Sequence, residues 1–286
     1  MIQQNITINL INSSGNNSVT LAITNGGSFR HFSTLTNGSL TGVSMTIGVG
    51  IILDGGGTGG GIFIFGSGCS LTLDGCIITN CRNSGNGGGL LVQGNISRSS
   101  LIMNAALIEN CQAGSGGGVF AAGCDIEMNG GEITGNRANN SGGGITTIAG
   151  GTRLGCTLTI NGGKIIANST VLAFGDAGGT NAFDTIVTIQ NSEISNNTAD
   201  NNGGGIIANN IAFMDGGAII ANGSLVSIAG AEIINNTAAG DGGSIFIDML
   251  ANLTVFASVI FSGNTAQRLL SFLNVFNNYD IGVGMK

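Results

Sequence analysis

The chain has 286 residues, of which 8% are charged, and its 15 acidic and 8 basic side chains leave a net charge of −7. This sparse and acidic charge argues against a nucleic-acid partner, which needs basic patches that displace counterions. The sequence contains no run of about 18 apolar residues, so no membrane span is predicted. The 53 glycines recur in register, so they indicate a repeated fold rather than a flexible linker.

The N-terminal part of the chain, residues 1–62, contains short alternating runs such as 6–10 without a clear repeat. The first residues lack the charged and apolar regions of a signal peptide. Terminal units of a stacked fold are commonly atypical because they cap its core. We therefore expect one domain over 1–286, with atypical coils or a cap at 1–62, regular coils at 63–266 and a C-terminal cap or assembly segment at 267–286.

From about residue 70 onward the chain repeats one pattern, of which residues 126–145 are a clear example. An alternating strand leads to a Gly-rich turn, a short strand ending in Asn, a polar stretch, and Gly-Gly-Gly before a third apolar strand. Such a unit cannot bury its own apolar face and must stack on its copies. The repeat predicts an all-β fold, a right-handed parallel β-helix (solenoid) of about eight or nine coils, each of roughly 26–32 residues with outward loops.

The asparagine that ends the second strand sets the register of the repeat. Its spacing varies from 26 to 39 residues, and the longest step contains an extra piece at 214–223. Placed in one line, these asparagines predict an inward ladder of amide hydrogen bonds, with a ligand column as the alternative. The ladder consists of Asn80, Asn110, Asn136, Asn168, Asn197, Asn236 and Asn264.

A second column lies four residues before the first and carries most of the regularly placed charges. Its members are Cys76, Ala106, Glu132, Lys164, Glu193, Glu232 and Ile260. Opposite charges on neighbouring coils predict a solvated charge ladder, with a group of catalytic carboxylates as the alternative. The remaining cleft candidates are Asp176 and Asp184, which flank a long loop. Since unlike groups do not converge, we expect no enzyme activity, cofactor or metal site.

The six cysteines also fall into columns. Cys81 and Cys111 both follow the asparagine position, whereas Cys124 and Cys156 share a place at the start of the first strand. Neighbours in register have Cα atoms about 4.8 Å apart, within the range that a disulfide accepts. Each pair is therefore a candidate disulfide, with buried free thiols as the alternative. The absence of a CxxC motif and of a second histidine excludes a zinc motif.

Eleven Asn-x-Ser/Thr sites occur in the chain, a modest excess over chance. Those on outward positions are candidates for N-glycosylation. The candidates are Asn95, Asn139, Asn196, Asn222 and Asn235. A glycan on Asn168 would contradict the register, because Asn168 is itself a ladder position.

The Gly-Gly-Gly-[Ile/Val/Leu] runs at 87–90, 116–119, 142–145 and 203–206, with Phe261-Ser-Gly-Asn264, carry a family resemblance. They resemble the paired GGA[ILV] and FxxN motifs in the passenger repeats of chlamydial polymorphic outer-membrane proteins. The wider resemblance, over about 70–265, is to pectin-lyase-like right-handed β-helix surface proteins. It implies an extracellular or surface-exposed protein used in adhesion or in building surface structures.

The sequence as a whole predicts a non-enzymatic, extracellular or cell-surface solenoid with a structural or adhesive role. Open coil ends favour head-to-tail assembly into a homo-oligomer or filament, and a surface or glycan receptor is the other expected partner. The alternative is a β-helix protein that binds or cleaves polysaccharides.

Overall fold

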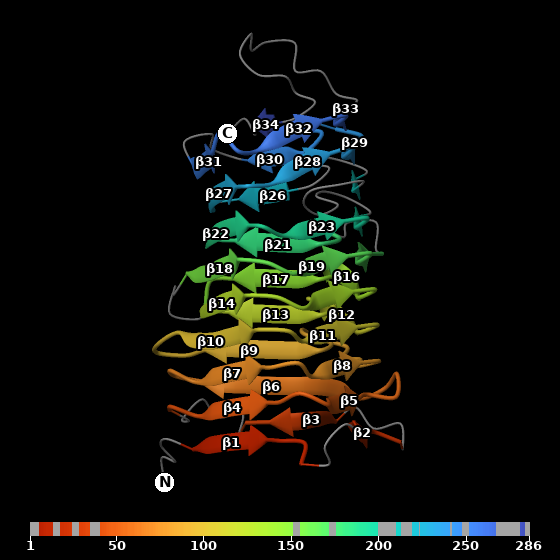
Figure 1. The fold of residues 1–286 in the computed structure, drawn as a ribbon, viewed down its shortest axis with the longest axis vertical. Helices are drawn as coiled ribbons and strands as arrows, with labels where there is room; N and C mark the ends of the chain where they lie inside the picture. The colour runs from red at the N-terminus through yellow and green to blue at the C-terminus, as the bar shows by residue number, and fades with distance from the viewer. Residues whose placement is uncertain are drawn as a thin grey trace.

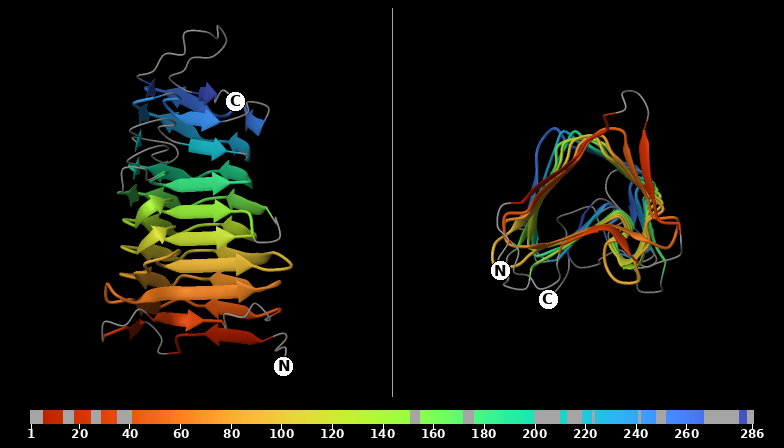
Figure 2. Two further views of the ribbon diagram at one scale, coloured as in Figure 1. Left: turned by 180° about the vertical axis from the view of Figure 1, so that it is seen from behind. Right: turned by 90° about the horizontal axis from the view of Figure 1, so that it is seen from below.

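In the computed structural model, the chain forms a stack of short parallel strands from one end to the other (Figure 1). Viewed along the stack, the turns superimpose in a rounded, roughly triangular outline (Figure 2). The structure describes residues 6–13, 18–24, 29–34, 41–150, 155–171, 176–199, 210–212, 219–222, 224–240, 242–247, 252–266 and 281–283.

Four faces make up the wall, and the chain visits them in the same order on each regular turn. Face 1 contains nine strands: β1 (Thr7–Leu10), β4 (Ser44–Ile47), β7 (Ser70–Leu73), β10 (Ser99–Met103), β14 (Cys124–Met128), β18 (Cys156–Ile160), β22 (Thr185–Gln190), β27 (Leu225–Ala229) and β31 (Leu253–Val255). In the part of the chain that the structure describes, face 2 contains seven strands: β2 (Val19–Ala22), β5 (Ile51–Asp54), β8 (Ile77–Thr79), β11 (Leu107–Glu109), β15 (Glu132–Thr134), β19 (Lys164–Ile166) and β23 (Glu193–Ser195). Among the described residues, β28 (Glu232–Ile234) and β32 (Ile260–Ser262) pair separately as a two-stranded sheet.

The other two faces complete each turn. Face 3 contains β12 (Gln112–Ser115), β16 (Arg137–Ser141), β20 (Ser169–Thr170), β24 (Thr198–Ala199), β25 (Ile211–Ala212), β29 (Thr237–Ala238) and β33 (Thr265–Ala266). Face 4 contains β3 (Arg30–Ser33), β6 (Gly60–Gly66), β9 (Leu90–Gly94), β13 (Val119–Ala122), β17 (Ile145–Ile148), β21 (Thr180–Phe183), β26 (Ile219–Asn222), β30 (Ile245–Ile247) and β34 (Ile281–Val283).

The core is built from columns of apolar side chains that repeat from turn to turn. On face 1, Leu71, Leu101, Ile126 and Leu158 lie in register and are at most 2% exposed. The intervening residues point outward, which gives the buried and half-exposed alternation of the strands. Burial of one such side chain contributes about 1.5–3 kcal/mol, so the repeated columns hold the turns together.

The run Gly142–Gly144 shows why glycine is required at this corner. Gly142 has a φ of 58°, a conformation that glycine adopts without strain. A Cβ on Gly143 would lie 2.5 Å from the backbone nitrogen of Ser169 on the next turn. A Cβ on Gly144 would lie 3.2 Å from the Asn168 Nδ2 inside the solenoid. The corner therefore depends on close approach of backbones as well as on turn geometry.

The predicted all-β class and parallel solenoid are confirmed. Among the described residues, two faces contain seven strands and two contain nine, compared with the eight or nine coils expected. The N-terminal segment expected as atypical coils contributes β1 to β5 to the same sheets as the regular repeat. The wall strand after β21 is β26 at Ile219–Asn222, within the piece expected as an outward insertion. Residues 203–206, expected at that position, and the C-terminal segment 267–280 lie outside the described residues.

Candidate functional site

A column of buried asparagines runs through the interior where face 2 turns into face 3. From Asn168 onward, each side-chain oxygen of the column accepts hydrogen bonds from the backbone N–H and from the Nδ2 of the preceding asparagine. Asn136 thus donates to the Asn168 Oδ1 at 3.0 Å through both groups, and Asn168 donates to the Asn197 Oδ1 at 2.9 and 3.0 Å. Five of these amides also donate to a backbone carbonyl, as Asn168 Nδ2 does to Ile133 O at 2.9 Å.

The column has a member that the sequence pattern missed. Asn210 accepts from the Asn197 Nδ2 at 3.2 Å and donates to the Asn236 Oδ1 at 2.7 Å. The Asn236 Nδ2 in turn donates to the Asn264 Oδ1 at 3.0 Å. The long step from 197 to 236 therefore contains an additional rung, which accompanies the additional strand β25 on face 3. Asn210 is only 13 residues beyond Asn197, too short a distance to register as a full repeat.

The predicted ladder is wrong at its first two positions. Asn80 and Asn110 are exposed, with φ values of 51° and 53°, and they lie one residue before the column. The inward places belong to Cys81 and Cys111, and the Cys111 backbone N–H donates to the Asn136 Oδ1 at 2.9 Å. Asparagine tolerates the left-handed conformation better than most residues, so Asn80 and Asn110 serve the bend rather than the ladder.

The same slip of one residue affects the start of the second column. Ile77 and Leu107, not Cys76 and Ala106, lie in register with Glu132 on face 2. Cys76 is buried and burial raises its pKa to about 12.

Beyond this point the charges fall on neighbouring strands as expected. Glu132, Lys164 and Glu193 are in register, and the Lys164 Nζ lies 3.0 Å from the Glu193 Oε2. Hydrogen bonds from Lys164 and then from Ser195 lower the pKa of Glu193. Both charged side chains are about half exposed, so the pair is solvated.

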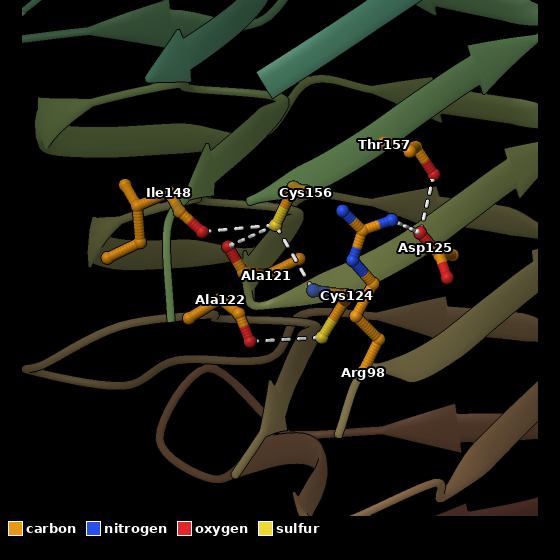
Figure 3. Close-up of polar contacts among 8 residues, drawn as sticks. All are labelled: Arg98, Ala121, Ala122, Cys124, Asp125, Ile148, Cys156 and Thr157. Carbon is orange, nitrogen blue, oxygen red and sulfur yellow. Dashed lines mark hydrogen bonds and ion pairs between the residues drawn. The ribbon is translucent and has the colours of Figure 1, made fainter. Parts of the chain in front are cut away.

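All six cysteines are buried and present as free thiols. Ser99, Cys124 and Cys156 share one column, in which the Cys124 backbone N–H donates to the Cys156 Sγ at 3.2 Å (Figure 3). Each thiol is directed to backbone carbonyls, Cys124 to Ala122 at 3.2 Å and Cys156 to Ile148 at 3.0 Å. Burial raises the pKa of Cys124 to about 12 and also raises that of Cys156.

An ion pair covers the outside of the Cys124 strand (Figure 3). The Asp125 Oδ1 accepts from the Arg98 guanidinium at 2.8 Å and from the Thr157 hydroxyl at 2.8 Å. Since Arg98 and Asp125 are both more than a third exposed, the pair is worth little in free energy but joins three successive turns.

Candidate acids for polysaccharide chemistry are not gathered in one place. Asp176 forms an isolated bridge with Ser141 before β21, whereas Asp184 follows β21 at the corner with face 1. The strand between them holds the two carboxylates at opposite ends of face 4. The segment between the two acids, expected as part of a long loop, therefore contains wall strand β21, and the two carboxylates do not converge on one cleft.

The glycosylation candidates differ in their exposure. Asn196 and Asn235 are exposed and have positive φ values at the bend before the asparagine column. Asn95 and Asn139 are half-buried, and the side chain of Asn222 lies outside the described residues. Asn168 is fully buried, which leaves no room for a glycan.

A cavity of about 630 Å³ opens on face 2 between β23 and β28. Its polar lining includes Lys164, Asn191, Ser192, Glu193 and Glu232. In the part of the chain that the structure describes, no three His, Cys, Asp or Glu side chains gather as metal ligands. No helix among the described residues is both long enough and apolar enough to cross a membrane.

These features define the protein as a parallel β-solenoid with an internal amide column. Comparison with protein-family models, curated proteins and solved structures finds no match.

Proposed function

We propose that the chain is a non-enzymatic structural or adhesive solenoid of the cell exterior that stacks end to end with its own copies. The continuous column from Asn136 to Asn264 supports this role, because it ties each turn to the next along most of the stack. Buried and satisfied amide networks stiffen the structure that contains them. A stiff rod suits a protein that bears load or presents loops at a distance.

The observation that carries the assembly is the open edge at the N-terminal end. Among the described residues, β1 pairs only with β4, β2 only with β5 and β3 only with β6. Ile8, Val19 and Phe29 on or beside these strands are 38%, 39% and 78% exposed. Unpaired edges with apolar side chains are templates for pairing with another chain. The two ends of the stack differ, so their contact would be head-to-tail and would propagate.

Negative-stain electron microscopy and light scattering of the purified chain test this assembly. We expect filaments, and we expect Ile8→Lys combined with Val19→Lys to return monodisperse rods. Thr159→Lys, on the outward side of β18 in the middle of the stack, is the matched control and should keep the filaments. Monodisperse wild-type rods, or filaments that survive the edge substitutions, would refute stacking through this end.

The family resemblance supports the proposed location. The Gly-Gly-Gly-[Ile/Val/Leu] runs and the Phe261-to-Asn264 motif resemble those of extracellular passengers and of pectin-lyase-like surface proteins. Exposed acceptor sites at Asn196 and Asn235 are compatible with a glycoprotein. Secretion of the chain to the cell surface, measured by protease accessibility on intact cells, tests this part.

A second candidate function, glycan binding, rests on the cavity on face 2. Carboxylate, ammonium, amide and hydroxyl groups line it together, and such groups hydrogen-bond to the hydroxyls of sugars. Calorimetric titration with acidic and neutral oligosaccharides tests binding. Loss of binding in Glu193→Gln and Glu232→Gln, with retention in Glu127→Gln on face 1, would support it.

A further inference from the structure

The N-terminal continuation of the asparagine column is chemically different from the rest. Cys81 and Cys111 replace asparagine on two successive turns, 1% and 0% exposed. Their thiols are directed to the backbone carbonyls of Thr79 at 3.3 Å and Glu109 at 3.1 Å. Two adjacent inward sulfurs thus stand where the interior otherwise carries amides.

His31 is on strand β3, at the N-terminal end of face 4. The pairing of β3 with β6 places His31 opposite Gly61, and the pairing of β6 with β9 places Gly61 opposite Gly89. A Cβ on the next glycine of that column, Gly89, would lie 3.4 Å from the Cys111 Sγ, so the column faces the sulfurs. On the following turn a side chain at this position is excluded, because a Cβ on Gly61 would collide with the Gly89 carbonyl oxygen.

Both ring nitrogens of His31 face backbone carbonyl oxygens. Nε2 lies 2.8 Å from the Leu21 carbonyl oxygen and Nδ1 lies 3.1 Å from the Gly60 carbonyl oxygen. Only a doubly protonated ring can donate to both acceptors. Although burial lowers the pKa of His31, the hydrogen bond and charge of Cys81 and these two carbonyls raise it overall.

The opposite charge lies on the neighbouring sulfur. The pKa of Cys81 is lowered to about 6, first by a hydrogen bond from Cys111 and then by the hydrogen bond and charge of His31. Burial acts in the opposite direction but is outweighed. Burial and the neighbouring Cys81 raise the pKa of Cys111 far above its ordinary value. The charged groups that act on the two thiols are His31, Arg30 and Glu109.

We propose that Cys81 and Cys111 form a peroxide-reactive dithiol in which Cys81 attacks as the thiolate, Cys111 resolves, and His31 acts as the general acid. The Cys81 sulfur attacks one peroxide oxygen, the O–O bond breaks, and a sulfenic acid forms. The departing hydroxide takes a proton from His31 and leaves as water. The Cys111 sulfur then attacks the Cys81 sulfur, the S–O bond breaks, and the hydroxide released takes the Cys111 proton. Two thiols lose two electrons, and one hydrogen peroxide becomes two waters.

The chain contains its own control in Cys124 and Cys156. These sulfurs are also neighbours in one column and their thiols are also directed to backbone carbonyls. No histidine acts on them, and burial raises the pKa of both thiols. The thiolate is the reactive form of cysteine, so the two pairs should differ in rate. A disulfide at 81–111 would cross-link adjacent turns next to the open N-terminal edge.

To test this proposal, the folded full-length chain is treated with hydrogen peroxide. The remaining thiols are then blocked in denaturant, and the disulfides are mapped by mass spectrometry. We expect the Cys81–Cys111 disulfide to form at least tenfold faster than Cys124–Cys156, and His31→Gln to slow only the first pair. In Cys111→Ser, oxidation should stop at a Cys81 sulfenic acid that dimedone traps. The thiolate absorbance at 240 nm should rise near pH 6 and disappear in Cys81→Ser. Equal rates for the two pairs, no response to His31→Gln, or no absorbance change near pH 6 would overturn the proposal.

Discussion

Asn136 and Asn168 are 32 residues apart in the chain, yet the Asn136 Nδ2 donates to the Asn168 Oδ1 at 3.0 Å across adjacent turns. Asn168→Ala would remove this acceptor together with its donors to Ile133 O and to the Asn197 Oδ1. Buried polar groups without partners cost about 1–3 kcal/mol each, so we expect a loss of about 3–5 kcal/mol of unfolding free energy. Urea unfolding followed by circular dichroism measures it.

The control for this substitution is a second asparagine row on the outside of the wall. Asn129 accepts from Asn161 at 3.2 Å and donates to Asn104 at 3.4 Å, and all three side chains are exposed. Asn129→Ala should change the unfolding free energy by less than about 0.5 kcal/mol. Equal effects of the two substitutions would contradict the structural role assigned to the inner column.

Ala167 is the exception in a series of bends whose other members are mostly asparagine or glycine. It has a φ of 55°, and it stands at the bend position held by Asn196 and Asn235 on later turns. The left-handed conformation costs an ordinary residue about 1–2 kcal/mol, and asparagine less. Because Ala167 is exposed, Ala167→Asn should stabilise the chain by about 0.5–1 kcal/mol, measured as a higher midpoint of thermal unfolding.

The comparison for Ala167 is Ala105, which is also exposed but has no positive φ. Ala105→Asn should leave the midpoint unchanged or lower it slightly. A stabilisation of similar size at both positions would show that the gain comes from the side chain and not from the backbone conformation.

Gly144 tests the packing inside the corner rather than its backbone conformation. A Cβ there would lie 2.6 Å from Gly179 O and 3.0 Å from the Ile165 Cγ2, so Gly144→Ala should cost about 1–3 kcal/mol of unfolding free energy. The exposed Gly85 has only the flexible Asn83 side chain nearby, at 3.2 Å, so Gly85→Ala should be close to neutral. Urea unfolding of both variants decides between packing and a general cost of replacing glycine.

The repeat in the sequence predicted the solenoid because alternation and Gly-Gly-Gly recur in every regular unit. It misplaced Asn80 and Asn110 because asparagine suits both the bend and the inner column. The pairs Asn196–Asn197 and Asn235–Asn236 contain the needed signal, since the first residue of each bends the chain and the second points inward.

Two features of the interior were harder to find in the sequence. Asn210 was missed because the chain reaches it without completing a regular unit, although Asn209–Asn210 repeats the same Asn-Asn pair. The place of His31 depends on the three-dimensional register of an N-terminal strand whose sequence does not repeat.

The pKa of Glu193 reports directly on the outer charge ladder. Lys164 and then Ser195, whose hydroxyl donates to Glu193 Oε1 at 2.9 Å, lower it below the ordinary 4.5. The lowered value means that the stabilisation exists above the ordinary pKa and is lost as the pH falls through the lowered one. In a carbon-detected NMR titration, Lys164→Met should raise the pKa of Glu193 only part of the way, because Ser195 still donates. Adding Ser195→Ala should return it to the ordinary range, whereas an unchanged pKa in Lys164→Met would show that the two side chains do not pair in solution.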